Sequence, residues 1–393
     1  KYMQKEKKVK LLILTQKVDK NDPILGFFHR WLVEFAKHCE QVTVIALGVG
    51  EYDLPQNVRV FSLGKEQHLR DAEKVRSLAL EGEELRKRSD LGNFKRSVLE
   101  EQLQKIKYVI RFYRLIWRER NNYDAVFVHM NPIYVVLGGL LWRIMGKKIG
   151  LWYTHRSVDV KLRIAAALSH HIFTASSESF RMPSRKLHIL GHGVDIESFR
   201  CEDVQNCSDS TVINILHVGR ITHIKNIDIL IEAARILKEK WEHTFHIALI
   251  GGHITASDLG YKKEIEDLIE KYGLQDTVTF KGNIPNMGMK SQYCMSDASV
   301  NLAPTGGVDK AVLESMAAGR PVFASNEAFR SYFSIYSKDL LFKERDAVDL
   351  SAKIMAFFGA GDRDKVKAYL LENVGETSSL QRLINSILTS LYK

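Results

Sequence analysis

The sequence predicts an α/β protein of two domains, each a parallel sheet covered by helices on both faces. At 393 residues the chain is too long for one ordinary hydrophobic core. Short apolar runs alternate with segments of helical periodicity, which is typical of parallel sheets. The alternation stops in a polar stretch at 196–211 and then begins again. We therefore expect an N-terminal domain at 1–195, a C-terminal domain at 196–375, and a last helix in 376–393 that could pack back on the first domain.

In the first half, apolar runs of strand length separate segments of helical character. The expected strands are 10–14, 42–47, 58–61, 125–129, 148–153 and 171–175. The expected helices are 26–38, a charged helical region at 66–120, 133–145 and 159–168.

The second half repeats this architecture without repeating the sequence. Its expected strands are 212–218, 245–250, 278–280, 298–302 and 321–324. Its expected helices are 227–240, 260–272, 287–295, the helix that carries Glu314, 346–358 and 379–392.

The composition, 45% hydrophobic and 26% charged, is that of an ordinary globular protein. The cysteines are scattered without a C-x-x-C pair, which favours a reducing cytoplasm and argues against a disulfide framework or a zinc site. The apolar run at 11–15 is too short for a signal peptide, and the run at 133–141 is too short to span a bilayer. We therefore expect a cytoplasmic protein.

Positive charge is concentrated in the first half. Residues 1–195 hold 34 Lys and Arg against 21 Asp and Glu, so they carry +13 of a total net charge of +10, and the remainder carries −3. This asymmetry favours an anionic surface or substrate for the first domain, although solubility alone explains it equally well. Nucleic-acid binding is not expected, because the basic residues lack a known module.

One basic segment, KIKYVIRFYRLIWRER, combines several cations with several aromatic residues. Its cations lie at helical spacing and alternate with aromatic residues. The segment could be an interfacial helix that contacts anionic lipid at the inner face of a membrane. The alternative is a sheet-covering helix whose basic face is solvated. The residues concerned are Lys107, Arg111, Arg114 and Arg118, with Tyr108, Phe112, Tyr113 and Trp117 between them.

Two motifs in the second half suit a diphosphate. Gly219 and Arg220 follow the strand 212–218, and Lys225 comes soon after. Ligands of open α/β sheets bind at the carboxyl ends of strands. A glycine there permits close approach of the backbone, Arg220 can pair with two phosphate oxygens, and Lys225 adds a point charge. The alternative is a tight turn with two solvated cations.

The second motif opens the helix that carries Glu314. Two glycines in Thr305-Gly306-Gly307-Val308 would expose backbone N–H groups at a helix N-terminus, which favours an anion. Asp309 lies in the first turn, where simple capping is the alternative explanation.

These motifs together resemble GT-B fold glycosyltransferases of family 4, retaining enzymes that use nucleotide sugars. The resemblance covers essentially the whole chain and is most specific at 213–323. It implies two Rossmann-like domains facing across a cleft. The resembling positions are Gly219, Arg220, Lys225, Leu230, Ala233, Gly251-Gly252, Phe280-Lys281-Gly282, the run Leu313–Val322, and the hinge-like Gly191–Asp195 with His192 in place of Asn.

The resemblance also implies roles for single residues. Arg220 and Lys225 would bind the donor diphosphate, and Glu314 would bind its ribose. The backbone near Ile284 would contact the base, and His155 would lie close to the transferred sugar, with His129 as the competing histidine. The donor-binding set is completed by Gly26, Gly219, Gly251, Thr305, Gly306, Gly307 and Val308.

One position departs from the family pattern. The family's E-x7-E motif has a carboxylate eight residues before the second Glu, where this chain has Gly306. Asp309 is the nearest acid and our candidate to replace it, which leaves the donor sugar open. We expect no metal and no cofactor, because no D-x-D motif stands in a suitable context and cationic side chains can stabilise the leaving diphosphate.

The resulting hypothesis is a retaining glycosyltransferase of cell-envelope polysaccharide or glycolipid synthesis. His155, Asp309, Arg220 and Lys225 would be its catalytic residues, and a glycan or lipid-linked molecule its acceptor. A GT-B fold nucleotide-sugar epimerase is one alternative. The other is a catalytically impaired homologue that only binds the nucleotide sugar, which Gly306 in place of Glu suggests.

Overall fold

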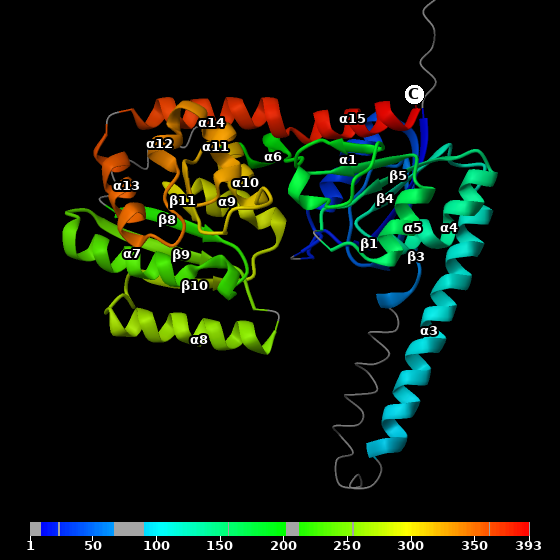
Figure 1. The fold of residues 1–393 in the computed structure, drawn as a ribbon, viewed down its shortest axis with the longest axis horizontal. Helices are drawn as coiled ribbons and strands as arrows, with labels where there is room; N and C mark the ends of the chain where they lie inside the picture. The colour runs from blue at the N-terminus through cyan, green and yellow to red at the C-terminus, as the bar shows by residue number, and fades with distance from the viewer. Residues whose placement is uncertain are drawn as a thin grey trace, which may run out of the picture. The chain divides into compact units, whose positions relative to one another are not determined.

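The structure is a computed structural model that describes residues 9–22, 24–66, 90–155, 157–201, 212–253, 255–360 and 362–392, with the side chains of 90–101 outside that description. The chain divides into two compact units. The first comprises Lys1–Thr174, Ser179–Ile189 and Ile384–Lys393, and the second comprises Ala175–Glu178 and Leu190–Leu383. Both units are α/β with a parallel sheet, so the predicted fold class is confirmed (Figure 1).

The first unit contains a seven-stranded parallel sheet in the order β3-β2-β1-β4-β5-β6-β7. Its central strands β1 and β4 each contain a continuous apolar run that is buried on both faces, Leu11–Leu14 and Ala125–Val128, as expected for a sheet covered by helices. The strands are β1 Val9–Val18, β2 Cys39–Val49, β3 Val58–Ser62, β4 Ala125–His129, β5 Lys148–Trp152, β6 His171–Thr174 and β7 Leu187–Ile189.

The helices of this unit cover the sheet with apolar faces. They are α1 Phe28–His38, α3 Asp90–Arg118, α4 Ile133–Ile144 and α5 Val160–Leu168, with the short η1 Ser177–Ser179 between the units in sequence. The part of the predicted 66–120 helix before Asp90 lies largely outside the described residues. The last helix, α15 Leu380–Tyr392, ends in this unit, where the Tyr392 hydroxyl donates to the carbonyl of Lys10 at 3.0 Å.

The second unit contains a five-stranded parallel sheet in the order β10-β9-β8-β11-β12. Its strands are β8 Val212–Val218, β9 Thr244–Ile250, β10 Val278–Gly282, β11 Ala298–Asn301 and β12 Val322–Ala324. Its helices are α6 Ile196–Phe199, η3 His223–Lys225, α7 Ile227–Lys240, α8 Ala256–Lys271, η4 Asn286–Gly288, α9 Met289–Cys294, α10 Lys310–Ala317, η5 Glu327–Phe329, α11 Arg330–Phe333, η6 Ser334–Tyr336, α12 Ser337–Leu340, α13 Ala347–Gly359 and α14 Arg363–Ser378.

Strand β7, helix α14 and the short helices α6, α11 and α12 were not predicted. Strand β7 has three residues, and its last residue, Ile189, is exposed, so it gives hardly any pattern. Helix α14 buries one apolar residue per turn (Val366, Leu370 and Val374) among charged neighbours. That stripe is narrower than the apolar face by which helices of globular proteins are recognised.

The expectation of unpaired cysteines is wrong for one pair. Cys201 and Cys294 form a disulfide, with their Cα atoms 5.7 Å apart and 93 positions between them in sequence. The bond joins the segment after α6 to the end of α9. No local spacing announces such a pair, because only the fold brings the two residues together. Cys39 is free and buried, which raises the pKa of its thiol to about 12, and Cys207 lies outside the described residues.

Candidate functional site

Three glycines tie together the carboxyl ends of β8, β9 and β10. The Gly219 N–H donates to the Ile250 carbonyl and the Gly251 N–H donates to the Gly282 carbonyl, both at 2.9 Å. Gly251 has a φ of 139°, and a Cβ there would lie 1.9 Å from the carbonyl oxygen of Gly219. Only glycine fits at such a contact, so Gly251 fixes the path of the Gly219 backbone.

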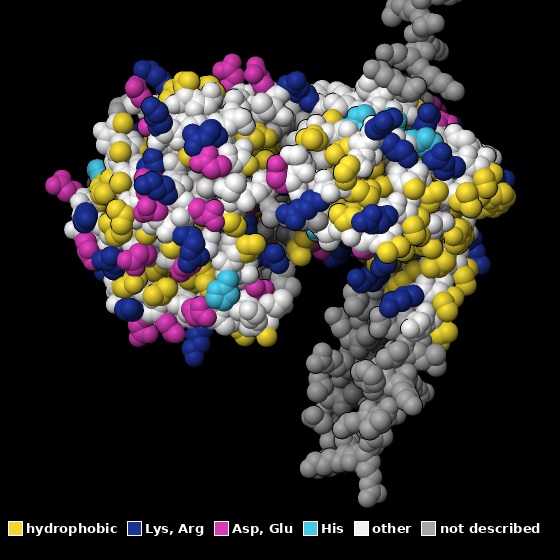
Figure 2. Space-filling view, viewed as in Figure 1, with side chains coloured by type: hydrophobic (Ala, Val, Ile, Leu, Met, Phe, Trp, Pro, Cys, Tyr) yellow, Lys and Arg dark blue, Asp and Glu magenta, His cyan; other side chains and the backbone are white. Residues whose placement is uncertain are grey.

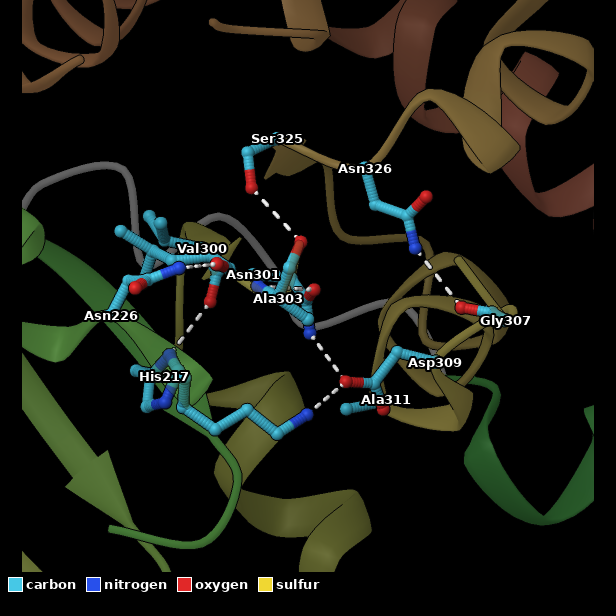
Figure 3. Close-up of polar contacts among 12 residues, drawn as sticks. His217, Asn226, Val300, Asn301, Ala303, Gly307, Asp309, Ala311, Ser325 and Asn326 are labelled. Carbon is cyan, nitrogen blue, oxygen red and sulfur yellow. Dashed lines mark hydrogen bonds and ion pairs between the residues drawn. The ribbon is translucent and has the colours of Figure 1, made fainter. Parts of the chain in front are cut away.

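The most informative contact joins two sequence motifs that are 84 residues apart. The Lys225 ammonium, in η3 after β8, forms an ion pair with the carboxylate of Asp309, the N-cap residue of α10. The Asn301 amide, at the end of β11, donates to the same carboxylate oxygen at 3.0 Å (Figure 3). Both charged side chains are about four-fifths buried. The ends of two neighbouring strands and the beginning of a helix therefore meet at one carboxylate.

This carboxylate stays ionised. Burial works against ionisation of Asp309, but the Lys225 ammonium and the hydrogen bonds from Lys225 and Asn301 outweigh burial and lower its pKa. Lys225 is therefore neutralised locally by Asp309. An anion that binds Lys225 shares the ammonium with this carboxylate.

A histidine that sequence analysis missed lies under the same motif. His217, in β8, is fully buried, and because a carbonyl only accepts, its Nδ1 donates to the Val300 oxygen at 3.0 Å (Figure 3). Its Nε2 has no hydrogen-bond partner among the described residues. A Cβ built on Gly219 would lie 3.4 Å from this Nε2 and 3.4 Å from Cε of Lys225. The free lone pair therefore lies beneath the Gly219 turn, close to Lys225.

Burial lowers the pKa of His217 to about 4. The hydrogen bond to Val300 opposes this shift, the nearby Lys225 ammonium adds to it, and Asp309 opposes it. The ring is therefore neutral at physiological pH and Nε2 is an acceptor. The one sequence signal that could have found it is a histidine in an otherwise apolar stretch of β8.

Some backbone N–H groups of the glycine loop before α10 already donate hydrogen bonds to side chains of the same chain. The Thr305 N–H donates to the Glu344 carboxylate and the Gly306 N–H donates to the Asn326 amide, each at 3.3 Å. The Asn326 amide in turn donates to the Gly307 carbonyl at 3.0 Å (Figure 3). The expectation of unengaged N–H groups is therefore wrong for Thr305 and Gly306. The Gly307 N–H donates to no residue in the described part of the chain.

His192 also contacts this loop. It is partly buried, and burial lowers its pKa to about 4. The Lys310 ammonium adds to this shift, whereas Asp309 and a hydrogen bond to the Val308 backbone oppose it. At position 192, where the family pattern has Asn, this chain thus has a neutral imidazole ring beside Asp309.

Glu314 is buried on α10 and held by two neighbouring elements. Its carboxylate accepts from the Tyr293 hydroxyl at 3.3 Å and from the Asn286 amide at 3.5 Å. Burial, with the Glu314 charge added, raises the pKa of Tyr293. Tyr293 precedes the disulfide residue Cys294, so the carboxylate predicted to bind ribose is oriented by a covalently anchored helix.

The remaining predicted donor residues lie at the same sheet edge. Arg220 is exposed, and in the described part of the chain its side chain makes no hydrogen bond or ion pair. Ile284 is half-buried and packs on the core of this unit. The side chain of Asn283 lies over Gly252, 2.5 Å from where a Cβ would be. Arg220 is thus an exposed cation beside the turn that Gly219 and Gly251 fix.

The predicted residues of the first unit lie on other loops. His155 follows β5 and is exposed, and its ring packs edge-on against that of Tyr153, with 5.6 Å between the ring centroids. Gly26 ends a turn in which a Cβ would lie 2.5 Å from the Asp22 carbonyl, so glycine is required there. His129 is buried and stacks on Phe28 at 4.0 Å, which makes it a structural histidine.

The described residues contain no group of three or more His, Cys, Asp or Glu side chains placed to hold a metal ion. Nor does any helix among them have the length and hydropathy needed to cross a bilayer.

Comparison with known sequences finds a family for the second unit. Residues 202–369 match the family described as Glycosyl transferases group 1. The colanic acid biosynthesis glycosyltransferase named WcaL of Escherichia coli is 30% identical over 185 residues, 44% of this chain and 43% of WcaL. The amylovoran biosynthesis glycosyltransferase AmsK of Erwinia amylovora is 27% identical over 157 residues, 37% of this chain and 35% of AmsK. The chain thus matches about half or less of the length of these relatives.

Comparison with solved structures covers the whole chain. HepE of Anabaena, in complex with UDP, superimposes with a TM-score of 0.68 at 15% identity, over 97% of this chain and 99% of HepE. HepE has also been solved with UDP-glucose. At this identity the likeness shows the fold, which is the two-domain GT-B architecture.

Proposed function

We propose that the chain, whose residues 202–369 match the glycosyl transferases group 1 family, transfers a sugar from a nucleotide-diphosphate sugar to an acceptor hydroxyl in cell-envelope polysaccharide synthesis. The relatives named for colanic acid and amylovoran synthesis support the pathway class. The acceptor proposed is a glycan or a lipid-linked glycan. The complexes of HepE with UDP and UDP-glucose support a uridine nucleotide as the first donor to test.

One observation carries this proposal: Lys225 and Asn301 converge on the N-cap residue of α10. Phosphate groups bind where strand ends, backbone N–H groups and a helix N-terminus come together. In the proposed complex the diphosphate contacts Lys225, the Gly219 turn and the Gly307 N–H. The Glu314 carboxylate, four residues into α10, accepts from the ribose hydroxyls.

The proposed reaction is a retaining transfer in which the acceptor attacks from the face that the diphosphate leaves. Arg220, Lys225 and the start of α10 stabilise the negative charge that develops on the leaving diphosphate. Asp309 holds Lys225 in place and contacts the sugar. No metal is needed in this scheme, so activity is expected to persist in EDTA.

The test uses Arg220→Ala, because Arg220 is exposed and its side chain forms no hydrogen bond or ion pair with the residues that the structure describes. We expect transfer and donor hydrolysis to fall by about 100-fold or more, with a thermal midpoint unchanged within experimental error. Lys263→Ala, at an exposed site on α8, is the matched control and should leave turnover unchanged. Turnover close to that of the unmodified protein in Arg220→Ala would reject the assignment.

The two alternatives are separated by the donor and the products. A thermal-shift panel of UDP-, GDP- and ADP-sugars identifies the nucleotide, since a specific ligand raises the unfolding midpoint by mass action. An epimerase would convert the sugar without an acceptor, whereas a transferase releases nucleoside diphosphate and extends one. A stabilising nucleotide sugar from which no sugar is ever released would mark a binding homologue. In the cell, the protein is proposed to act at the cytoplasmic face of the membrane.

A further inference from the structure

Helix α3 exposes an unusual row of apolar side chains. Leu103, Ile106, Ile110, Tyr113 and Trp117 follow one another at spacings of three and four, with between 39% and 54% of each side chain exposed. That spacing places them on one face of the helix. The sheet is contacted by a different face, formed by the buried residues Phe112, Leu115 and Ile116. Helix α3 is therefore apolar on two faces, and the sheet covers only one.

The row continues onto the two neighbouring helices. The Tyr113 hydroxyl donates to the Leu137 carbonyl at 2.8 Å, which joins α3 to α4, and Arg143 donates to the Leu168 carbonyl at 2.9 Å, which joins α4 to α5. Figure 2 shows hydrophobic side chains gathered over this part of the first unit, with Lys and Arg beside them. The exposed residues added by α4 and α5 are Leu140 (64%), Ile144 (75%), Val160 (70%) and Ile164 (42%).

We call these nine residues of α3, α4 and α5 the apolar face. Half of the large hydrophobic side chains exposed in the described part of the chain belong to it. Monomeric proteins rarely leave so contiguous an apolar surface uncovered unless it binds something.

Positive charges predominate around the apolar face, and the one exposed carboxylate beside it on α5 is the N-cap residue Asp159, next to Val160. From 102 to 118 the sequence contains five Lys and Arg and no Asp or Glu. Helices α4 and α5 add Arg143, Lys161 and Arg163, again without an acidic residue. Lys107 and Arg114 are exposed and directly flank the row on α3.

We propose that the apolar face binds the surface of an anionic lipid bilayer, with its aliphatic side chains in the acyl boundary and its cations at the headgroups. Tyr113 and Trp117 suit this interface because each has an apolar ring with a polar group at its edge. Long-range attraction between the cations and anionic lipids adds to the burial of apolar area. The protein binds peripherally and does not span the membrane.

The charges also decide against the main competing occupant, a second copy of this chain. The spacing of the row on α3 resembles a coiled-coil seam. However, the exposed side chains that flank it, Lys107 and Arg114, are both cationic. Two copies packed along this seam would bring cations against cations in either direction, which is unfavourable. A negatively charged surface removes that repulsion.

The test is co-sedimentation of the full chain with vesicles of phosphatidylcholine alone or with added phosphatidylglycerol. We expect binding only to the anionic vesicles, weakened by salt because the charges lie in high dielectric. Lys107→Ser with Arg114→Ser should weaken binding by about 25-fold, about fivefold for each cation removed. Ile110→Gln with Trp117→Gln should weaken it by about tenfold or more for each side chain.

The matched control is Leu259→Gln with Ile335→Gln. These side chains are exposed to a similar or greater extent than Ile110 and Trp117, 52% and 72%, but lie in the second unit. This variant should bind vesicles like the unmodified protein, and circular dichroism should show that all variants are folded. Arg220→Ala should also bind normally, which separates this proposal from the proposed donor chemistry.

Three results would overturn the proposal. One is equal binding to neutral and anionic vesicles. Another is a dimer, seen by light scattering, that Trp117→Gln dissociates while vesicle binding is absent. The third is vesicle binding that appears only after residues 67–89 are deleted, since the apolar face would then be covered by the chain itself.

Discussion

Replacing Gly251 by alanine tests whether the strand-end turns of the second unit are built as described. Alanine at a φ of 139° costs about 1–3 kcal/mol. Its Cβ would lie 1.9 Å from the Gly219 carbonyl oxygen, so one backbone must move by about 1.5 Å to restore an ordinary contact. That movement disturbs the Gly219 hydrogen bond to Ile250, worth about 1 kcal/mol. The expected loss of unfolding free energy is about 3 kcal/mol.

Urea denaturation measures this loss, and hydrogen exchange in β8 and β9 assigns it to the second unit. Gly260→Ala is the matched control in the same unit, because no atom lies within 4 Å of its Cβ position and it lies inside the exposed part of α8. It should stabilise the protein by about 1 kcal/mol. A free energy of unfolding for Gly251→Ala within about 1 kcal/mol of that of the unmodified protein would contradict the described geometry of the turn.

Two further predictions concern acid and reduction. The pKa of His217 is about 4 in the folded protein and about 6.5 in the unfolded chain, so its contribution to the free energy of unfolding, about 3 kcal/mol, is complete above pH 6.5 and is lost as the pH falls toward 4. In His217→Gln the free energy of unfolding should therefore depend less on pH between pH 4 and 6.5. An unchanged slope would contradict the burial argument. Reducing Cys201–Cys294 should cost about 4 kcal/mol, because the bond closes a loop of 93 residues; the unfolding midpoint should fall in dithiothreitol but not in a variant with both residues replaced by serine, and four titratable thiols in unreduced, denatured protein would show that the bond is not formed.

The local elements of the second unit could be predicted where their patterns are strong. Strand 212–218 and helix 227–240 were predicted with the observed limits, because a continuous apolar run and a full amphipathic face mark them. The helix of Glu314 was predicted, but it begins at Lys310, so the two glycines lie in the loop before it and Asp309 is its N-cap residue. In contrast, the side chains that organise the site were not predicted. Asn301 and Asn326 act through partners that the chain brings together only when it folds.

The same limit explains the errors about charge and backbone. The sequence showed Lys225 as a cation, but not the carboxylate of Asp309 that neutralises it. It showed the N–H groups of Thr305 and Gly306, but not the Glu344 and Asn326 side chains that accept from them. Residue type predicts what a group can bind. Only the fold shows which groups are already bound.

The ion pair of Lys225 with Asp309 has a consequence for the exchange of anions at this edge of the sheet. In the proposed site an incoming anion shares the Lys225 ammonium with an internal carboxylate, so a weakly charged anion gains little from this contact. A diphosphate gains more, because it carries more charge and a second cation is available in the exposed Arg220. When the proposed diphosphate product dissociates, Asp309 still neutralises the ammonium, which lowers the energy of the emptied site and favours release.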